Sequence, residues 1–104
     1  MVECYTCGSK HKIVEIQCGH FMGRSNLGTR WLEANCRPQC MECNYFKTGN
    51  IEEFENKLHE ENGALVEYLR EIARQTAKPT RDELKALIIE YRAKLVLVKK
   101  KFIK

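Results

Sequence analysis

The sequence predicts a small α+β protein, with a cysteine-rich module at residues 1–49 followed by a helical part at residues 50–104. All six cysteines and the single tryptophan lie before Gly49. Beyond Gly49 the apolar residues recur at the spacing of amphipathic helices. Because 104 residues can bury only a modest core, we expect a bound metal, a second chain or both to add stability.

Charge is distributed unevenly around a net value of +4. Residues 51–79 are acidic overall, whereas residues 1–50 and especially 80–104 are basic. Basic ends of this kind are typical of a nucleic-acid-binding protein, although an ordinary solvated helical surface has the same composition. No apolar run is long enough for a membrane span, and residues 1–10 lack the apolar region of a secretory signal. We therefore expect a cytoplasmic protein whose cysteines bind metal rather than form disulfides.

The first part predicts the order strand, loop, strand, short helix. Alternating apolar residues favour a strand at 12–17, and a second short strand is expected at 30–33. The segment 18–29 is rich in Gly, Ser and Asn, which predicts a loop. The segment 41–48 is expected to form a short helix that ends at Gly49.

Two helices are expected next. Asn50 can cap the first, with Glu53 as its capping-box partner, and Asn62-Gly63 ends it after Glu61. The second helix is expected over residues 64–77. Its predicted apolar face consists of Leu65, Tyr68, Leu69 and Ile72.

A third helix is expected from the Thr80–Glu83 capping box, just after Pro79, towards Lys104. Its apolar residues follow the alternating three- and four-residue steps of a coiled-coil seam. The seam consists of Leu84, Ile88, Tyr91, Leu95, Val98 and Phe102. Four further apolar residues, Leu87, Ile89, Val96 and Leu97, widen the stripe, so packing within the chain and pairing of two chains both remain open.

Two cysteine pairs predict a structural zinc site. The x-x spacing within each pair lets both thiolates of a turn face one ion, and two such turns complete a tetrahedral set. The ligands are Cys4, Cys7, Cys40 and Cys43. Four free buried cysteines are the alternative. Cys18 and Cys36 are expected to fill the core as small apolar side chains, with substitution as zinc ligands as the other possibility.

Between and beside these pairs lie residues suited to phosphodiester hydrolysis. A neutral His20 can take a proton from water, although a lone histidine in a glycine-rich loop is often structural. The amide oxygen of Asn44 is a hard ligand suited to Mg²⁺ or Mn²⁺. Asn35 is placed to hydrogen-bond across the loop and hold His20.

Several of these motifs resemble the NinG (Rap) family of phage lambda. They are Gly19-His20-Phe21-x-x-Arg24, Arg30-Trp31-x-Glu33-x-Asn35, Gln39-Cys40-x-x-Cys43-Asn44, Gly49-Asn50 and, more loosely, Tyr91-Arg92-x-Lys94-Leu95. The resemblance implies a recombination endonuclease that acts on Holliday junctions and D-loops and depends on a divalent metal such as Mg²⁺ or Mn²⁺. It also implies a homodimer encoded by a phage or prophage and located in the cytoplasm of the bacterial host.

The site also resembles that of endonuclease VII-type junction resolvases, which implies a zinc-stapled ββα-metal (H-N-H, His-Me finger) fold for residues 1–49. In those enzymes an Asp-His pair supplies a metal ligand and the base, and an asparagine follows the last zinc cysteine, as Asn44 does here. This chain has Gly19 at the acidic position. Glu33, Asn26 or water could supply the missing ligand.

The expected DNA contacts near the site are basic, although each is equally an ordinary surface charge. They are Arg24, Arg30, Arg37 and Lys47. The helical part is expected to dimerise and to bind DNA through the lysines of its third helix, whereas His11 and His59 are expected to be surface residues. Two other functions remain open: a non-catalytic zinc module that binds DNA or a recombination protein, and an H-N-H nicking enzyme acting on linear duplex.

Overall fold

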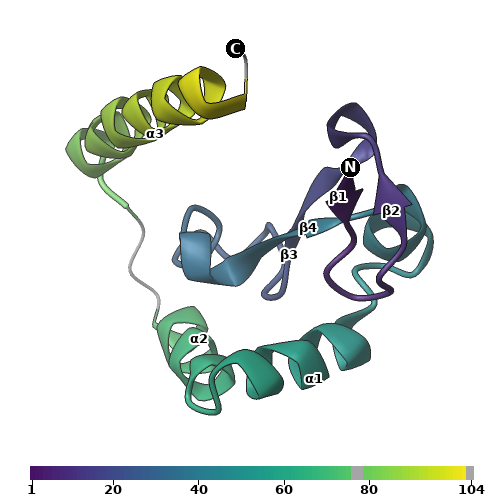
Figure 1. Cartoon of the computed structure of the whole chain (residues 1–104). Helices are drawn as coiled ribbons and strands as arrows, with labels where there is room; N and C mark the ends of the chain where they lie inside the picture. Colours follow the sequence, from purple (N-terminus) through teal and green to yellow (C-terminus); the bar gives the residue numbers. More distant parts are fainter. Residues whose placement is uncertain (76–78, 103–104) are drawn as a thin grey trace.

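The computed structural model describes residues 1–75 and 79–102. Its first part contains two small antiparallel sheets (Figure 1). Strand β1 (Val2–Glu3) pairs with β2 (Lys10–His11), and β3 (Gln17–His20) pairs with β4 (Cys36–Gln39). In the second sheet, His20 is opposite Cys36 and Gln17 is opposite Gln39. The Tyr5 N–H donates to the Pro38 carbonyl at 2.8 Å, which joins the turn after β1 to β4.

Both predicted strands are wrong in position. The segment 12–17 is mostly a single 3₁₀ turn, η1 (Ile13–Glu15), in which Ile13 and Val14 are 66% and 86% exposed. The alternating apolar residues at 12–17 therefore do not form the buried face of a sheet. The segment 30–33 forms turns that lead into a second 3₁₀ turn, η2 (Glu33–Asn35). The strands β3 and β4 lie further along the chain than predicted. Their residues have weak strand propensity, and the pairing between the two strands determines where they form.

The predicted short helix after Cys40 is confirmed in position, but its central turn, η3 (Glu42–Phe46), is π-helical. Turn residues follow η3 as far as Gly49, whose φ of +91° lies in the left-handed region that glycine adopts without strain. The expected order of strand, loop, strand and helix is therefore present, with shifted strand bounds.

Helices α1 (Ile51–Glu61) and α2 (Leu65–Arg74) follow. The predicted bounds of α1 and its end at Asn62-Gly63 are confirmed. Asn50 is the N-cap residue, as predicted, but it is left-handed, with φ 48° and ψ 51°, and its side chain makes no cap hydrogen bond. In α2, Val66 rather than Tyr68 is buried, and Tyr68 is 53% exposed. The predicted end of this helix, Ala77, lies outside the described residues.

A compact apolar core connects the first part of the chain to α1 and α2. Its buried members are Phe21, Phe54, Leu58, Val66 and Leu69. The rings of Phe21 and Phe54 lie 5.6 Å apart, and Tyr5 packs against Phe54 at the same distance. Burial of each such side chain stabilises the fold by about 1.5–3 kcal/mol. The segments 1–49 and 50–104 share this core, and their division into a nuclease module and a DNA-binding, dimerising part stays a prediction.

The last helix, α3 (Arg81–Phe102), lies apart from α1 and α2 (Figure 1). Its predicted capping box is confirmed: the Thr80 N–H donates to Glu83 Oε1 at 3.4 Å, and the Glu83 N–H donates to Thr80 Oγ1 at 3.1 Å. No helix within residues 1–75 and 79–102 is long and apolar enough to cross a membrane.

Two polar contacts attach α3 to the loop that follows β3. Tyr91 Oη donates to the Trp31 carbonyl at 2.6 Å, and Lys94 pairs with Glu33. The apolar seam residues Ile88, Leu95 and Val98 remain 45–51% exposed. The side chains of Phe102, the last residue of the predicted seam, and of Lys100, Lys101 and Lys104, three of the lysines expected to bind DNA, lie outside the described residues.

Candidate functional site

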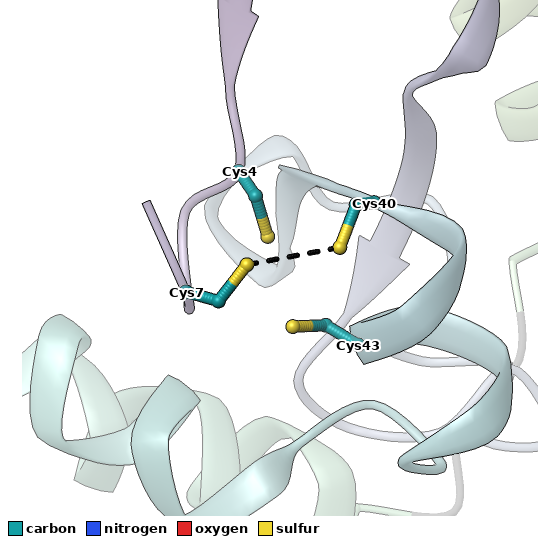
Figure 2. Close-up of side chains that lie close together, drawn as sticks. All are labelled: Cys4, Cys7, Cys40 and Cys43. Atoms are coloured by element: carbon teal, nitrogen blue, oxygen red, sulfur yellow. Dashed lines mark hydrogen bonds between the residues drawn. The ribbon is translucent and has the colours of Figure 1, made fainter. Parts of the chain in front are cut away.

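The four predicted zinc ligands come together, and Figure 2 shows their sulfur atoms facing a common centre. One pair lies in the turn after β1, and the other lies at the end of β4 and in η3. All four Sγ atoms lie within 4.8 Å of one another, and the Cys7–Cys40 distance is 3.8 Å. Tetrahedral zinc with Zn–S bonds of about 2.3 Å requires a sulfur–sulfur distance of about 3.8 Å. This cysteine tetrad can therefore hold zinc.

The environment of the tetrad favours thiolate at the N-terminal pair. Burial raises the pKa of Cys4, but hydrogen bonds from Thr6 and from nearby backbone N–H groups outweigh it and bring the pKa to about 5. A hydrogen bond with Ser9 lowers the pKa of Cys7. Burial raises the pKa of Cys43 to about 11. The thiolate is the form of cysteine that binds metal. Because their pKa values are lowered, Cys4 and Cys7 are readily deprotonated to this form.

Ser9 also contacts a residue expected to have no role. The His11 ring lies 2.7 Å from Ser9 Oγ, which lies 3.0 Å from Cys7 Sγ. His11 is half-buried, and through Ser9 it lies next to the tetrad. His59 is exposed, as predicted.

Gln39 connects the tetrad to the second sheet. Its buried side chain donates from Nε2 to Thr6 Oγ1 at 3.1 Å and to the Gly49 carbonyl at 2.8 Å. The other end of the amide lies against Gly19, where an added Cβ would be only 1.9 Å from Gln39 Oε1. No side chain, acidic or otherwise, fits at position 19 while Gln39 keeps this place.

A cleft of about 810 Å³ lies between the second sheet, the following loop, η3 and α3. It is lined by Gln17, Cys18, His20, Arg24, Arg30, Trp31, Leu32, Glu33, Cys36, Asn44, Thr48, Gly49 and Tyr91. The structure thus brings together four of the predicted site residues, namely His20, Asn44, Arg24 and Arg30. Three others, Asn35, Arg37 and Lys47, are not among the lining residues.

His20 is held in one orientation by the loop. Its Nε2 lies 3.1 Å from the carbonyl oxygen of Arg30. A carbonyl oxygen can only accept a hydrogen bond, so the neutral ring carries its proton on Nε2. The lone pair then belongs to Nδ1, which can accept a proton or bind a metal.

Asn35 is fully buried and stabilises the same loop from behind. Its Oδ1 accepts from the Met22 N–H at 2.7 Å, and its Nδ2 donates to the carbonyls of Met22 at 3.0 Å and Thr29 at 3.2 Å. These bonds cross the loop directly beside Arg30. The geometry makes Asn35 a positioning residue, and its importance for catalysis stays a prediction.

Oxygen donors also lie along the cleft. Asn44 Nδ2 donates to Gln17 Oε1 at 2.7 Å, which leaves the Asn44 amide oxygen available as a ligand. Glu33 lines the cleft and pairs with Lys94. Asn26, the other candidate for the missing acidic ligand, is bound within the loop: it accepts from Thr29 N–H at 3.1 Å and donates to the Ala73 carbonyl at 2.9 Å.

The four predicted DNA-contacting residues fall into two groups. Arg24 and Arg30 line the cleft, and the Arg30 guanidinium lies 4.8 Å from the centre of the Trp31 ring. Arg37 forms a bidentate pair with Glu61 at 2.9 and 3.2 Å, and only 16% of its side chain is exposed. Lys47 is exposed outside the cleft. Contact of any of these residues with DNA stays a prediction.

Cys18 and Cys36 do not fill the core as expected, because Cys18 is exposed and Cys36 is half-buried. Their thiols and a ring nitrogen of His20 form a second group, in which all ligand atoms lie within 4.8 Å of one another. A hydrogen bond from the Cys36 thiol lowers the pKa of Cys18 to about 6, and the same bond raises the pKa of Cys36. The spacing Cys18-x-His20 is the sequence pattern that could have indicated this group, because alternate residues of a strand lie on the same face of the sheet.

The comparisons with known proteins identify the family. The family model described as Bacteriophage Lambda NinG protein matches residues 2–101, nearly the whole chain. No curated protein and no solved structure shows a significant match. The chain therefore belongs to the bacteriophage lambda NinG protein family.

Proposed function

We propose that this NinG-family protein is a metal-dependent DNA endonuclease that hydrolyses phosphodiester bonds in branched recombination intermediates such as Holliday junctions and D-loops. One observation carries the proposal: His20, held through Nε2 by the Arg30 carbonyl, shares a cleft with Asn44, Arg24 and Arg30. The cleft thus combines a base, a hard oxygen donor and two phosphate-binding cations.

In this proposal His20 is the general base. Its Nδ1 accepts the proton of the attacking water, while Nε2 keeps its hydrogen bond to Arg30. Arg24 and Arg30 bind the oxygens of the phosphates on the cleft wall, because guanidinium groups match phosphate geometry. Asn35 supports the reaction only through the loop that holds His20.

A divalent ion completes the proposed site. Asn44 and Glu33 offer the oxygen ligands that Mg²⁺ or Mn²⁺ prefers, and Gln17 fixes the orientation of the Asn44 amide. Such an ion supplies charge stabilisation for the phosphate and the leaving oxygen. Zinc at the cysteine tetrad has a structural role in this scheme, because its four protein ligands leave no open position.

The substrate assignment depends on assembly. Resolution of a four-way junction requires two symmetric incisions, which a two-fold dimer provides. The exposed apolar seam of α3 offers a surface for such a dimer, and the basic residues of this helix would lie along the DNA arms. We place this activity in the cytoplasm of the bacterial host, where phage recombination intermediates arise.

The decisive experiment incubates purified protein with a labelled four-way junction and with a linear duplex of matched sequence. The metal arms contain Mg²⁺, Mn²⁺, Ca²⁺ or no added ion, without a chelator that would also remove zinc. We expect paired cuts in the junction with Mg²⁺ or Mn²⁺ only. Asn44→Ala should raise the Mg²⁺ concentration required for half-maximal cleavage, because it removes a metal ligand.

Other outcomes identify the two alternative functions. Equal cleavage of the linear duplex would indicate an H-N-H nicking enzyme. Binding of DNA, or of a recombination protein, without cleavage in any metal would indicate a non-catalytic zinc module. In either case the junction-cutting proposal is wrong.

A further inference from the structure

The second cysteine–histidine group lies on one face of the β3–β4 sheet. Cys18 and His20 are alternate residues of β3, and Cys36 is the cross-strand partner of His20. The two sulfur atoms and the imidazole nitrogen all lie within 4.8 Å of one another. Regular strand pairing therefore brings three metal-binding side chains to one place, separate from the cysteine tetrad.

The chemistry of this group suits a borderline-soft ion. Two thiolates and one imidazole form a ligand set known from catalytic zinc sites, which keep a fourth position open. A metal-binding histidine usually donates its other N–H to a carbonyl or carboxylate, and His20 makes such a bond to Arg30. Thiolate ligands disfavour Mg²⁺, which selects oxygen donors. All three side chains line the cleft, so an ion can reach them.

We propose that Cys18, His20 and Cys36 form a second metal site that binds Zn²⁺ or Co²⁺ with three protein ligands and an open position towards the cleft. The site should bind more weakly than the tetrad, because it has three ligands instead of four and Cys18 is exposed. It is distinct from the Mg²⁺ or Mn²⁺ position at Asn44, which offers oxygen.

One consequence rests on the proposed function. Since Nε2 of His20 is engaged with Arg30, an ion at this site must use Nδ1, the atom assigned to proton transfer. Occupancy by zinc would thus remove the general base. We expect Zn²⁺ beyond the first equivalent to inhibit Mg²⁺-dependent cleavage.

The test measures metal binding directly. Protein carrying one zinc per chain is titrated with Co²⁺ in the presence of a phosphine reductant, which keeps the thiols reduced. We expect a second equivalent to bind, with thiolate-to-cobalt charge-transfer absorption and the visible bands of tetrahedral cobalt. Cys36→Ser and His20→Gln should abolish or strongly weaken this second equivalent and keep the first zinc. His59→Gln, which changes an exposed histidine of α1, is the matched control and should bind like the wild type.

The outcomes separate this inference from the proposed function. A wild-type protein that binds only one equivalent, or a Cys36→Ser variant that keeps both, would overturn the second site whatever the activity. Absence of cleavage in every metal would overturn the endonuclease proposal and leave the cobalt result standing. If zinc activates cleavage at the second site instead of inhibiting it, the site is retained and its inhibitory role is wrong.

Discussion

His20 Nε2 donates a hydrogen bond to the carbonyl oxygen of Arg30 at 3.1 Å, and this contact determines which ring nitrogen can react. The carbonyl belongs to the loop that Asn35 ties together through Met22 and Thr29. Because the loop is fixed by a fully buried side chain, the imidazole has a defined tautomer before any substrate binds. The backbone of the loop thus selects the proposed base, Nδ1.

The first prediction concerns this base. His20→Ala should lower the cleavage rate of a four-way junction by about 10²–10⁴-fold, the range expected for a general base. Binding of the junction, measured by fluorescence anisotropy in Ca²⁺, should change little, since the imidazole acts on the transition state. His59→Ala is the control and should cut normally. A His20→Ala variant that cuts at the wild-type rate would remove His20 from the mechanism.

The second prediction concerns the tetrad. Cys40→Ser should release the structural zinc and unfold much of the N-terminal part, because metal binding of this kind contributes about 10–16 kcal/mol in small zinc domains. Elemental analysis and circular dichroism measure the two effects. Cys18→Ser is the matched control and should keep the tetrad zinc. Unchanged zinc content in Cys40→Ser would show that the tetrad is not the zinc site.

The third prediction concerns Gly19. Gly19→Ala should destabilise the protein by about 1–3 kcal/mol, the usual cost of overpacking, because the new Cβ would overlap the buried Gln39 amide. Gly63→Ala is the control, since a Cβ at that position meets nothing within 4 Å. Thermal unfolding compares the two variants. Combining Gly19→Ala with Gln39→Ala should relieve part of the overlap, and strictly additive effects would contradict the proposed contact.

Local spacing explains what the sequence predicts well here. The two Cys-x-x-Cys turns, the Asn62-Gly63 stop and the Thr80–Glu83 capping box each act within a few residues, and each is observed. Strand β3 was missed because Gln17, Cys18, Gly19 and His20 have weak strand propensity and depend on pairing with β4. The cysteine–histidine group was missed for the same reason: the register that places Cys36 opposite His20 is not encoded locally.

The same limit applies to Arg37, which the sequence suggested as a DNA contact. Its bidentate pair with Glu61 joins two residues 24 positions apart in the chain, which no local pattern reveals. Hydrogen bonds from Tyr5 and Arg37 lower the pKa of Glu61 below the ordinary value of 4.5. A lowered folded-state pKa stabilises the fold above the ordinary pKa, and this contribution is lost as pH falls through the lowered value.

The fourth prediction follows from this pair. Arg37→Ala should lower the free energy of unfolding by about 1 kcal/mol at neutral pH, as for a partly exposed charged hydrogen bond, and leave DNA affinity nearly unchanged. The stability difference between wild type and Glu61→Gln should shrink as the pH falls from the ordinary carboxyl value of 4.5 through the lowered pKa of Glu61. Arg30→Ala is the comparison, since it should weaken DNA binding and spare stability. Loss of DNA affinity in Arg37→Ala at unchanged stability would restore its role as a phosphate contact.

The last prediction concerns the seam of α3. Half-buried Leu84 and Tyr91 lie beside Trp31, where an apolar groove of about 430 Å³ also includes Leu87, Ile88 and Leu95. Further along the seam, Leu95 and Val98 are 51% and 45% exposed. A contiguous exposed apolar stripe on a long helix is unusual for a monomer and is typical of an interface.

We therefore expect a homodimer at micromolar concentration, formed through α3, with both clefts directed towards DNA. Leu95→Glu should convert the dimer to a monomer and turn paired junction cuts into single nicks, because the charge would be buried in the seam. Leu97→Glu is the matched control: although Leu97 was expected to widen the stripe, residues two positions apart do not share a helix face, and it is 66% exposed, so its substitution should change neither property. Light scattering gives the mass, and a supercoiled cruciform plasmid distinguishes a nicked circle from a linear product. If Leu95→Glu keeps both the mass and the linear product, the seam packs within one chain and paired incision requires another explanation.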